Sequence, residues 1–132
     1  MSCSMAAGGF LSTPSNLVRF GFAMLYAEIL QKETVDLFWT PQRLNSGEPT
    51  GYGYGWSVTS MTLGDDEGRT PMITHGGRVL GGTATLIIFP EEDMVVVAMT
   101  NSDAGAGGLA RRLAALFRDP AEDRSDRVGS LQ

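Results

Sequence analysis

The sequence is poor in the residues that build cross-links and metal sites. Among its 132 residues, Cys3 is the only cysteine and His75 the only histidine. A single cysteine excludes an intramolecular disulfide, and these two side chains cannot complete a structural zinc site by themselves. Of the ten basic residues, Lys32 is the only lysine. We therefore expect no metal centre and no bound cofactor.

Long apolar runs and a basic surface are also missing. No stretch approaches the roughly 20 apolar residues of a membrane span. Residues 1–11 lack the basic and apolar regions of a signal peptide, so the sequence leaves the compartment open. The net charge of −5 disfavours nucleic acid, because phosphate binding needs a basic face. The composition is that of an ordinary globular domain, with neither a nucleic-acid nor a membrane partner expected.

Hydrophobic periodicity predicts helices near both ends of the chain and strands between them. Thr13 followed by Pro14 is a helix start signal. The expected helices cover residues 14–27, 32–39 and 108–117, and the expected strands cover residues 52–62, 72–75, 83–89 and 94–100. The last two strands are apolar on both faces, so both sides of the sheet should be covered.

This element order predicts an α+β fold, in which helices flank an antiparallel β-sheet. No repeat or linker divides the chain, so residues 1–118 are expected to form one unit. Residues 119–132 are highly charged, and we expect them to form a flexible tail.

Four short motifs follow one another along the chain. They are GGFLST at residues 8–13, YGYGW at 52–56, HGG at 75–77, and a segment from Phe89 to Asn101 that reads FP, then VVV, then TN. In this order and spacing they resemble motifs of the serine beta-lactamase and penicillin-binding-protein-like hydrolases. The resemblance covers about residues 7–116. It implies the C-terminal portion of a domain with a beta-lactamase/transpeptidase-like fold.

The resemblance also implies a chemistry and a set of site residues. In that family the serine of an S-x-x-K motif attacks an amide or ester, and a lysine and the tyrosine of Y-x-N handle protons. By resemblance, the segment His75-Gly76-Gly77 contacts a small-molecule amide or ester substrate. The backbone N–H of Gly77 or Arg78 would stabilise an oxyanion. The residues expected to line the substrate groove are Tyr52, Tyr54 and Trp56.

The chain departs from the family pattern at the nucleophile. Ile29 stands three residues before Lys32, so no S-x-x-K occurs, and no tyrosine begins a Y-x-N. In the family both motifs precede the Gly-Gly segment, so the chain resembles a domain whose N-terminal part is removed. We expect it to be inactive alone and to associate with that missing half or with a second copy. The alternative is a non-catalytic binding or self-associating module on the same sheet.

Three other features carry weaker interpretations. Residues 55–59 nearly match a G-x-S-x-G elbow, but Ser57 is expected inside a strand. Residues 105–110 fit the glycine pattern of a dinucleotide site, yet no later strand completes the parallel crossover that such a site needs. We expect a loop there. The acidic segments 65–67 and 91–93 are expected to be solvated turns, since they lack the spacing of a calcium loop.

Overall fold

A computed structural model describes residues 8–64 and 68–118. The described elements are α2 (Pro14–Leu25), α3 (Lys32–Phe38), β1 (Ser57–Met61), β2 (Thr70–Val79), β3 (Gly82–Phe89), the 3-10 turn η1 (Pro90–Glu92), β4 (Met94–Thr100) and α4 (Ala106–Arg118). The charged tail predicted at 119–132 and the acidic segment 65–67 lie outside the described residues.

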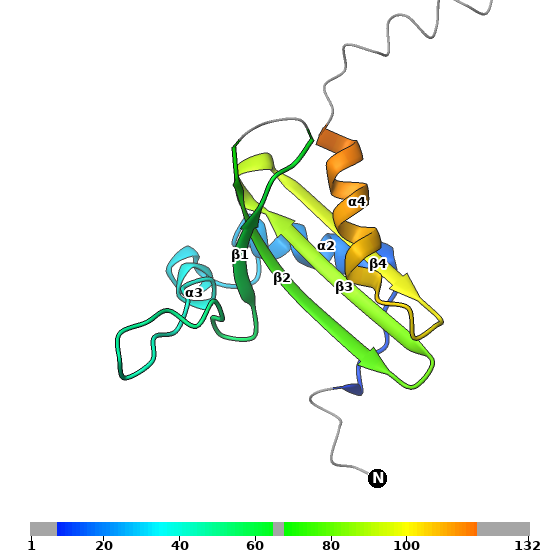
Figure 1. The fold of residues 1–132 in the computed structure, drawn as a ribbon, viewed down its shortest axis with the longest axis horizontal. Helices are drawn as coiled ribbons and strands as arrows, with labels where there is room; N and C mark the ends of the chain where they lie inside the picture. Colours follow the sequence, from blue (N-terminus) through cyan, green and yellow to red (C-terminus); the bar gives the residue numbers. More distant parts are fainter. Residues whose placement is uncertain (1–7, 65–67, 119–132) are drawn as a thin grey trace, which may run out of the picture.

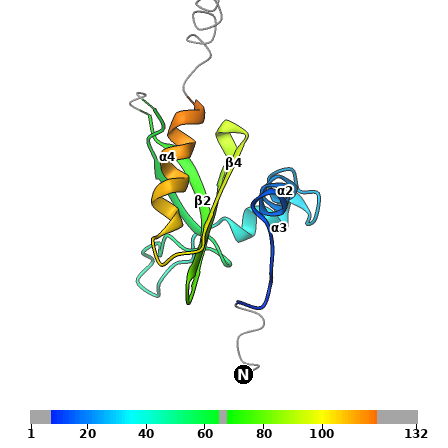
Figure 2. The same ribbon diagram turned by 90° about the vertical axis from the view of Figure 1, so that its right-hand side faces the viewer.

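The four strands form one antiparallel sheet in the order β1-β2-β3-β4 (Figure 1). Each strand pairs with its neighbour in sequence, as expected of an antiparallel sheet built from successive strands. Leu80 and Gly81 make the turn between β2 and β3, and Gly81 takes a φ of 76°. Figure 2 shows α4 on one side of the sheet and α2 with α3 on the other. The predicted α+β class is therefore confirmed.

Each face of the sheet has its own hydrophobic core, because successive side chains of a strand point to opposite faces. In β3, Ile87 and Phe89 pack under α4, whereas Leu86 and Ile88 pack under α2 and α3. The α4 side also contains Leu63, Met72, Val96, Ala98, Ala106, Ala110 and Ala114. The other side contains Met24, Val35, Trp56 and Ile73. The expectation that both faces are covered is confirmed.

Helix α2 begins as the sequence predicts. Thr13 is the N-cap, its hydroxyl accepts a hydrogen bond from the N–H of Asn16, and Pro14 opens the helix. At the other end, the Tyr26 hydroxyl donates to the Asp93 carboxylate over 2.7 Å. This hydrogen bond, more than any other influence, raises the pKa of Tyr26, because ionisation would break it. The bond ties the end of α2 to the turn before β4.

Two strand boundaries differ from the prediction. The strand expected over residues 52–62 is only Ser57–Met61. Gly51 and Gly55 adopt φ values of 69° and 79°, and such left-handed residues interrupt a ladder. Conversely, the short strand expected at 72–75 extends over Thr70–Val79, since the residues after His75 continue to pair with β3.

Candidate functional site

His75 lies in the middle of β2, not at the end of a strand as the sequence suggested. It pairs with Leu86 of β3, and its ring contacts Trp56 on the face covered by α2 and α3. The residue is nevertheless solvent-exposed. The histidine is therefore presented on a rigid strand and remains within reach of a ligand.

The His75 ring is held by two groups from the loop that precedes β1. Its Nδ1 lies 2.5 Å from the Gly55 carbonyl oxygen, which can only accept a hydrogen bond. The Trp56 ring meets the imidazole edge-on, with centroids 6.4 Å apart and planes at 76°. The ring orientation of His75 is thus fixed from two sides.

The outer edge of β2 loses its partner strand next to His75. Strand β1 pairs with β2 only as far as Ser57 opposite Thr74. Within the described residues, no strand pairs with that side of residues 76–79. The backbone there is an open edge of the kind that accepts an extended ligand.

The register decides which N–H groups face this open edge. A two-residue turn makes Val79 and Gly82 a hydrogen-bonded pair, and such pairs alternate along an antiparallel ladder. The N–H of Gly77 therefore donates a hydrogen bond to β3. The N–H groups of Gly76 and Arg78 point to the open edge. Of the two oxyanion donors that the resemblance allowed, the geometry favours Arg78.

The aromatic residues expected to line the groove do not share one strand face. Trp56 is 7% exposed, and its ring lies among those of Phe20, Trp39 and His75. Tyr52 and Tyr54 lie in the loop before β1 and are 45% and 52% exposed. Trp56 therefore supports His75 from within the core. The two tyrosines present their rings at the surface of the same loop.

The loop that carries Gly55 is braced against the end of α3. The N–H of Tyr54 donates to the Phe38 carbonyl over 3.0 Å, and the N–H of Gly53 donates to the Trp56 carbonyl over 2.7 Å. A Cβ at Gly53 would lie 2.1 Å from the Phe38 oxygen, so only glycine allows this approach. These backbone contacts consequently fix the position of the Gly55 carbonyl, the hydrogen-bond partner of His75.

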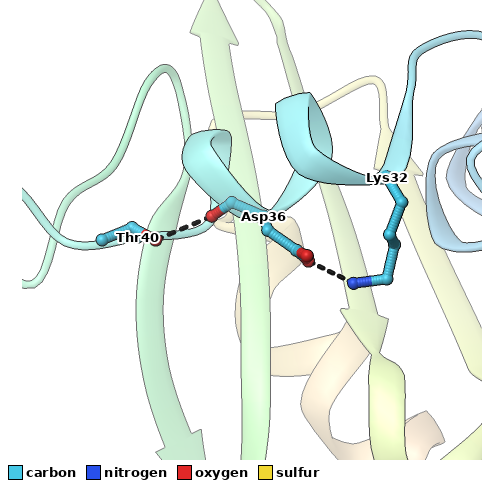
Figure 3. Close-up of polar contacts among 3 residues, drawn as sticks. All are labelled: Lys32, Asp36 and Thr40. Carbon is cyan, nitrogen blue, oxygen red and sulfur yellow. Dashed lines mark hydrogen bonds and ion pairs between the residues drawn. The ribbon is translucent and has the colours of Figure 1, made fainter.

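Lys32 does not belong to this site. Its Nζ forms an ion pair with Asp36 one turn along α3, and the Thr40 hydroxyl donates to the Asp36 carbonyl over 2.7 Å (Figure 3). Both charged side chains are more than half exposed, so the pair stabilises α3 only weakly. The only lysine of the chain is a surface residue of this helix.

The weaker candidates find structural roles. Ser57 is the first residue of the edge strand β1 and does not lie at a strand-to-helix elbow. Gly105 precedes α4, and its sheet is antiparallel, which excludes a dinucleotide-binding crossover. Residues 105–107 and residues 76–78 line the same groove of about 290 Å³.

Among the described residues, no group of three acidic, histidine or cysteine side chains converges for a metal. No helix in this part of the chain is long and apolar enough to cross a membrane.

Two features of the site were not predicted from the sequence. One is the Gly55 carbonyl as the partner of His75, and the other is an apolar groove of about 480 Å³ along the outer edge of β4. The alternating glycines at 51, 53 and 55 signal a loop with close backbone approach. Nothing in the local pattern indicates which side chain the loop approaches, since 20 residues separate Gly55 from His75.

Comparison with known proteins gives consistent relatives. The family model described as Beta-lactamase matches residues 2–118. The serine beta-lactamase-like protein LACTB, mitochondrial, of Homo sapiens is 30% identical over 111 residues, covering 69% of this chain and 20% of that protein. Penicillin-binding protein 4* of Bacillus subtilis (strain 168) is 26% identical over 92 residues, covering 70% of this chain and 19% of that protein. No solved structure gives a significant match.

An antiparallel sheet with helices on both faces, carrying the motifs above in order, is a partial beta-lactamase-like fold. The chain belongs to the beta-lactamase family of serine hydrolases and penicillin-binding proteins. It spans about a fifth of the length of the curated relatives that it matches.

Proposed function

We propose that the chain is the C-terminal part of a serine hydrolase domain and supplies the strand against which an amide or ester substrate lies. The observation that carries this proposal is the open edge of β2 beside an exposed, oriented His75. The N–H of Arg78 is the donor suited to a developing oxyanion. One such donor lowers an acyl-transfer barrier by about 3–4 kcal/mol.

The chain alone is proposed to be unable to form an acyl-enzyme. Its 132 residues contain neither S-x-x-K nor Y-x-N, and Lys32 is engaged with Asp36 on α3. Without an activated serine the difficult acyl transfer cannot be split into two easier steps. The remaining oxyanion donor accounts for only part of a typical enzymatic rate enhancement, which is about 8–23 kcal/mol.

The test is hydrolysis of a chromogenic beta-lactam by the purified chain. We expect the wild-type chain and His75→Ala to have equal rates, because neither contains an activated serine. Turnover by the wild-type chain that is lost in His75→Ala would contradict the proposed inactivity.

We also propose that the outer edge of β4 receives a β-strand from the remainder of the family domain. The groove there is flanked by Val18 and Phe22 of α2 on one face and by Leu113 and Phe117 of α4 on the other. Within the described residues, β4 pairs only with β3, so one side of its backbone is open. An open edge between apolar walls is a site for strand addition, and the relatives extend far beyond the matched region.

Without that strand, the same edge is expected to pair with a second copy of the chain. Light scattering coupled to size exclusion should show a mass that rises with concentration. Phe117→Glu should reduce this association, since Phe117 is 75% exposed at the groove. Leu80→Glu is the matched control, because Leu80 is fully exposed at the distant β2–β3 turn. A monomer at every concentration would contradict the docking proposal, as would equal effects of the two substitutions.

A further inference from the structure

The hydrogen bond between His75 and Gly55 has a consequence for what the histidine can bind. A neutral imidazole carries its proton on one nitrogen and accepts a hydrogen bond at the other. The Gly55 carbonyl lies 2.5 Å from Nδ1 and has no proton to give. The contact is favourable only when Nδ1 carries the proton.

We propose that the Gly55 carbonyl is a positioning group that holds neutral His75 as the Nδ1–H tautomer, so that Nε2 accepts a hydrogen bond from the ligand. This inference rests on the proposed function only for the identity of the ligand. The ligand group that fits a neutral Nε2 is a hydroxyl or an amide N–H. A carboxylate does not fit, because two acceptors would then face each other.

The acceptor at Gly55 is fixed before any ligand arrives. On its N-terminal side, the N–H of Tyr54 donates a hydrogen bond to the Phe38 carbonyl. On its C-terminal side, Trp56 is 7% exposed and its carbonyl accepts a hydrogen bond from the N–H of Gly53. The left-handed φ of Gly55, 79°, sets the direction of the chain between these anchors. The tautomer is thus determined by the fold of the loop, in the way that second contacts of catalytic and metal-binding histidines determine theirs.

His75 is the only histidine of the chain, which makes the tautomer directly measurable. A long-range proton–nitrogen correlation spectrum of the isotope-labelled chain, recorded at alkaline pH where imidazole is neutral, contains one imidazole pattern. We expect a pyrrole-type shift for Nδ1 and a pyridine-type shift for Nε2. The opposite assignment, or the averaged shifts of an unrestrained ring, would overturn the proposal.

Two glycine substitutions test the role of the carbonyl. Gly55→Ala places a side chain at a left-handed residue and should displace the carbonyl, moving the nitrogen shifts toward averaged values. Gly47→Ala is the matched control, because Gly47 has a φ of 86° and equally open surroundings but lies in the 43–50 loop. It should leave the pattern of His75 unchanged. Equal spectra for wild type and Gly55→Ala would show that the carbonyl does not set the tautomer.

The spectra distinguish this inference from the proposed function. They report the ring of His75 in the chain alone, whether or not any substrate is hydrolysed. An Nδ1–H tautomer in a chain that proves fully active would leave the inference standing and refute the proposed inactivity. Averaged nitrogen shifts in an inactive chain would refute the inference and leave the proposed inactivity standing.

Discussion

Replacing Phe89 with alanine is expected to lower the free energy of unfolding by about 3–5 kcal/mol. The Phe89 side chain is fully buried at the end of β3, in the core between the sheet and α4. Its removal loses apolar burial and leaves a cavity that the surrounding strand and helix cannot fill. Urea unfolding followed by circular dichroism measures the change.

The matched control is Phe10→Ala, the same substitution at a residue that is 87% exposed. It should change stability by no more than about 0.5 kcal/mol. Small proteins have a total stability of about 5–15 kcal/mol, so Phe89→Ala should leave the chain marginally folded. Equal losses for the two variants would mean that the core under α4 is not formed in solution.

Gly53→Ala is expected to detach the loop that orients His75. Its Cβ would lie 2.1 Å from the Phe38 carbonyl oxygen, and a backbone atom cannot move aside as a flexible side chain can. The displacement breaks two backbone hydrogen bonds of the loop, each contributing about 0.5–1.5 kcal/mol. It also exposes part of Trp56, whose burial contributes about 1.5–3 kcal/mol.

The expected total loss is therefore about 2–5 kcal/mol, with a red shift of tryptophan fluorescence as Trp56 meets water. The control is Gly68→Ala, since Gly68 has open surroundings and no left-handed backbone. That variant should be neutral or slightly stabilised. Unchanged fluorescence in Gly53→Ala would show that the loop does not rest on α3 as described.

Much of the fold is predictable because its signals are local. Thr13 and Pro14 mark the start of α2, and the continuous apolar character of residues 83–89 and 94–100 correctly predicts two central strands covered on both faces. The boundaries of β1 and β2 were wrong for a nonlocal reason. Tertiary pairing with β3 extends β2 through two glycines, whereas contacts with α3 turn the glycine-rich segment before β1 into a loop.

The candidate site was predictable in its residues but not in its geometry. The resemblance identifies His75 and the segment after it. Which N–H faces the open edge depends on the register set by the turn at Leu80 and Gly81. The partner of His75 depends on a backbone carbonyl, which has no sequence signature. The role of these residues in substrate binding stays a prediction.

The most direct test of the central claim is whether the chain alone carries an activated serine. The purified chain would be incubated with excess penicillin and, separately, with a fluorophosphonate, and its intact mass measured against a heat-unfolded sample. With no S-x-x-K in the sequence, we predict an unchanged mass in every sample. A stoichiometric adduct on one serine of the folded chain, absent after unfolding, would contradict the account.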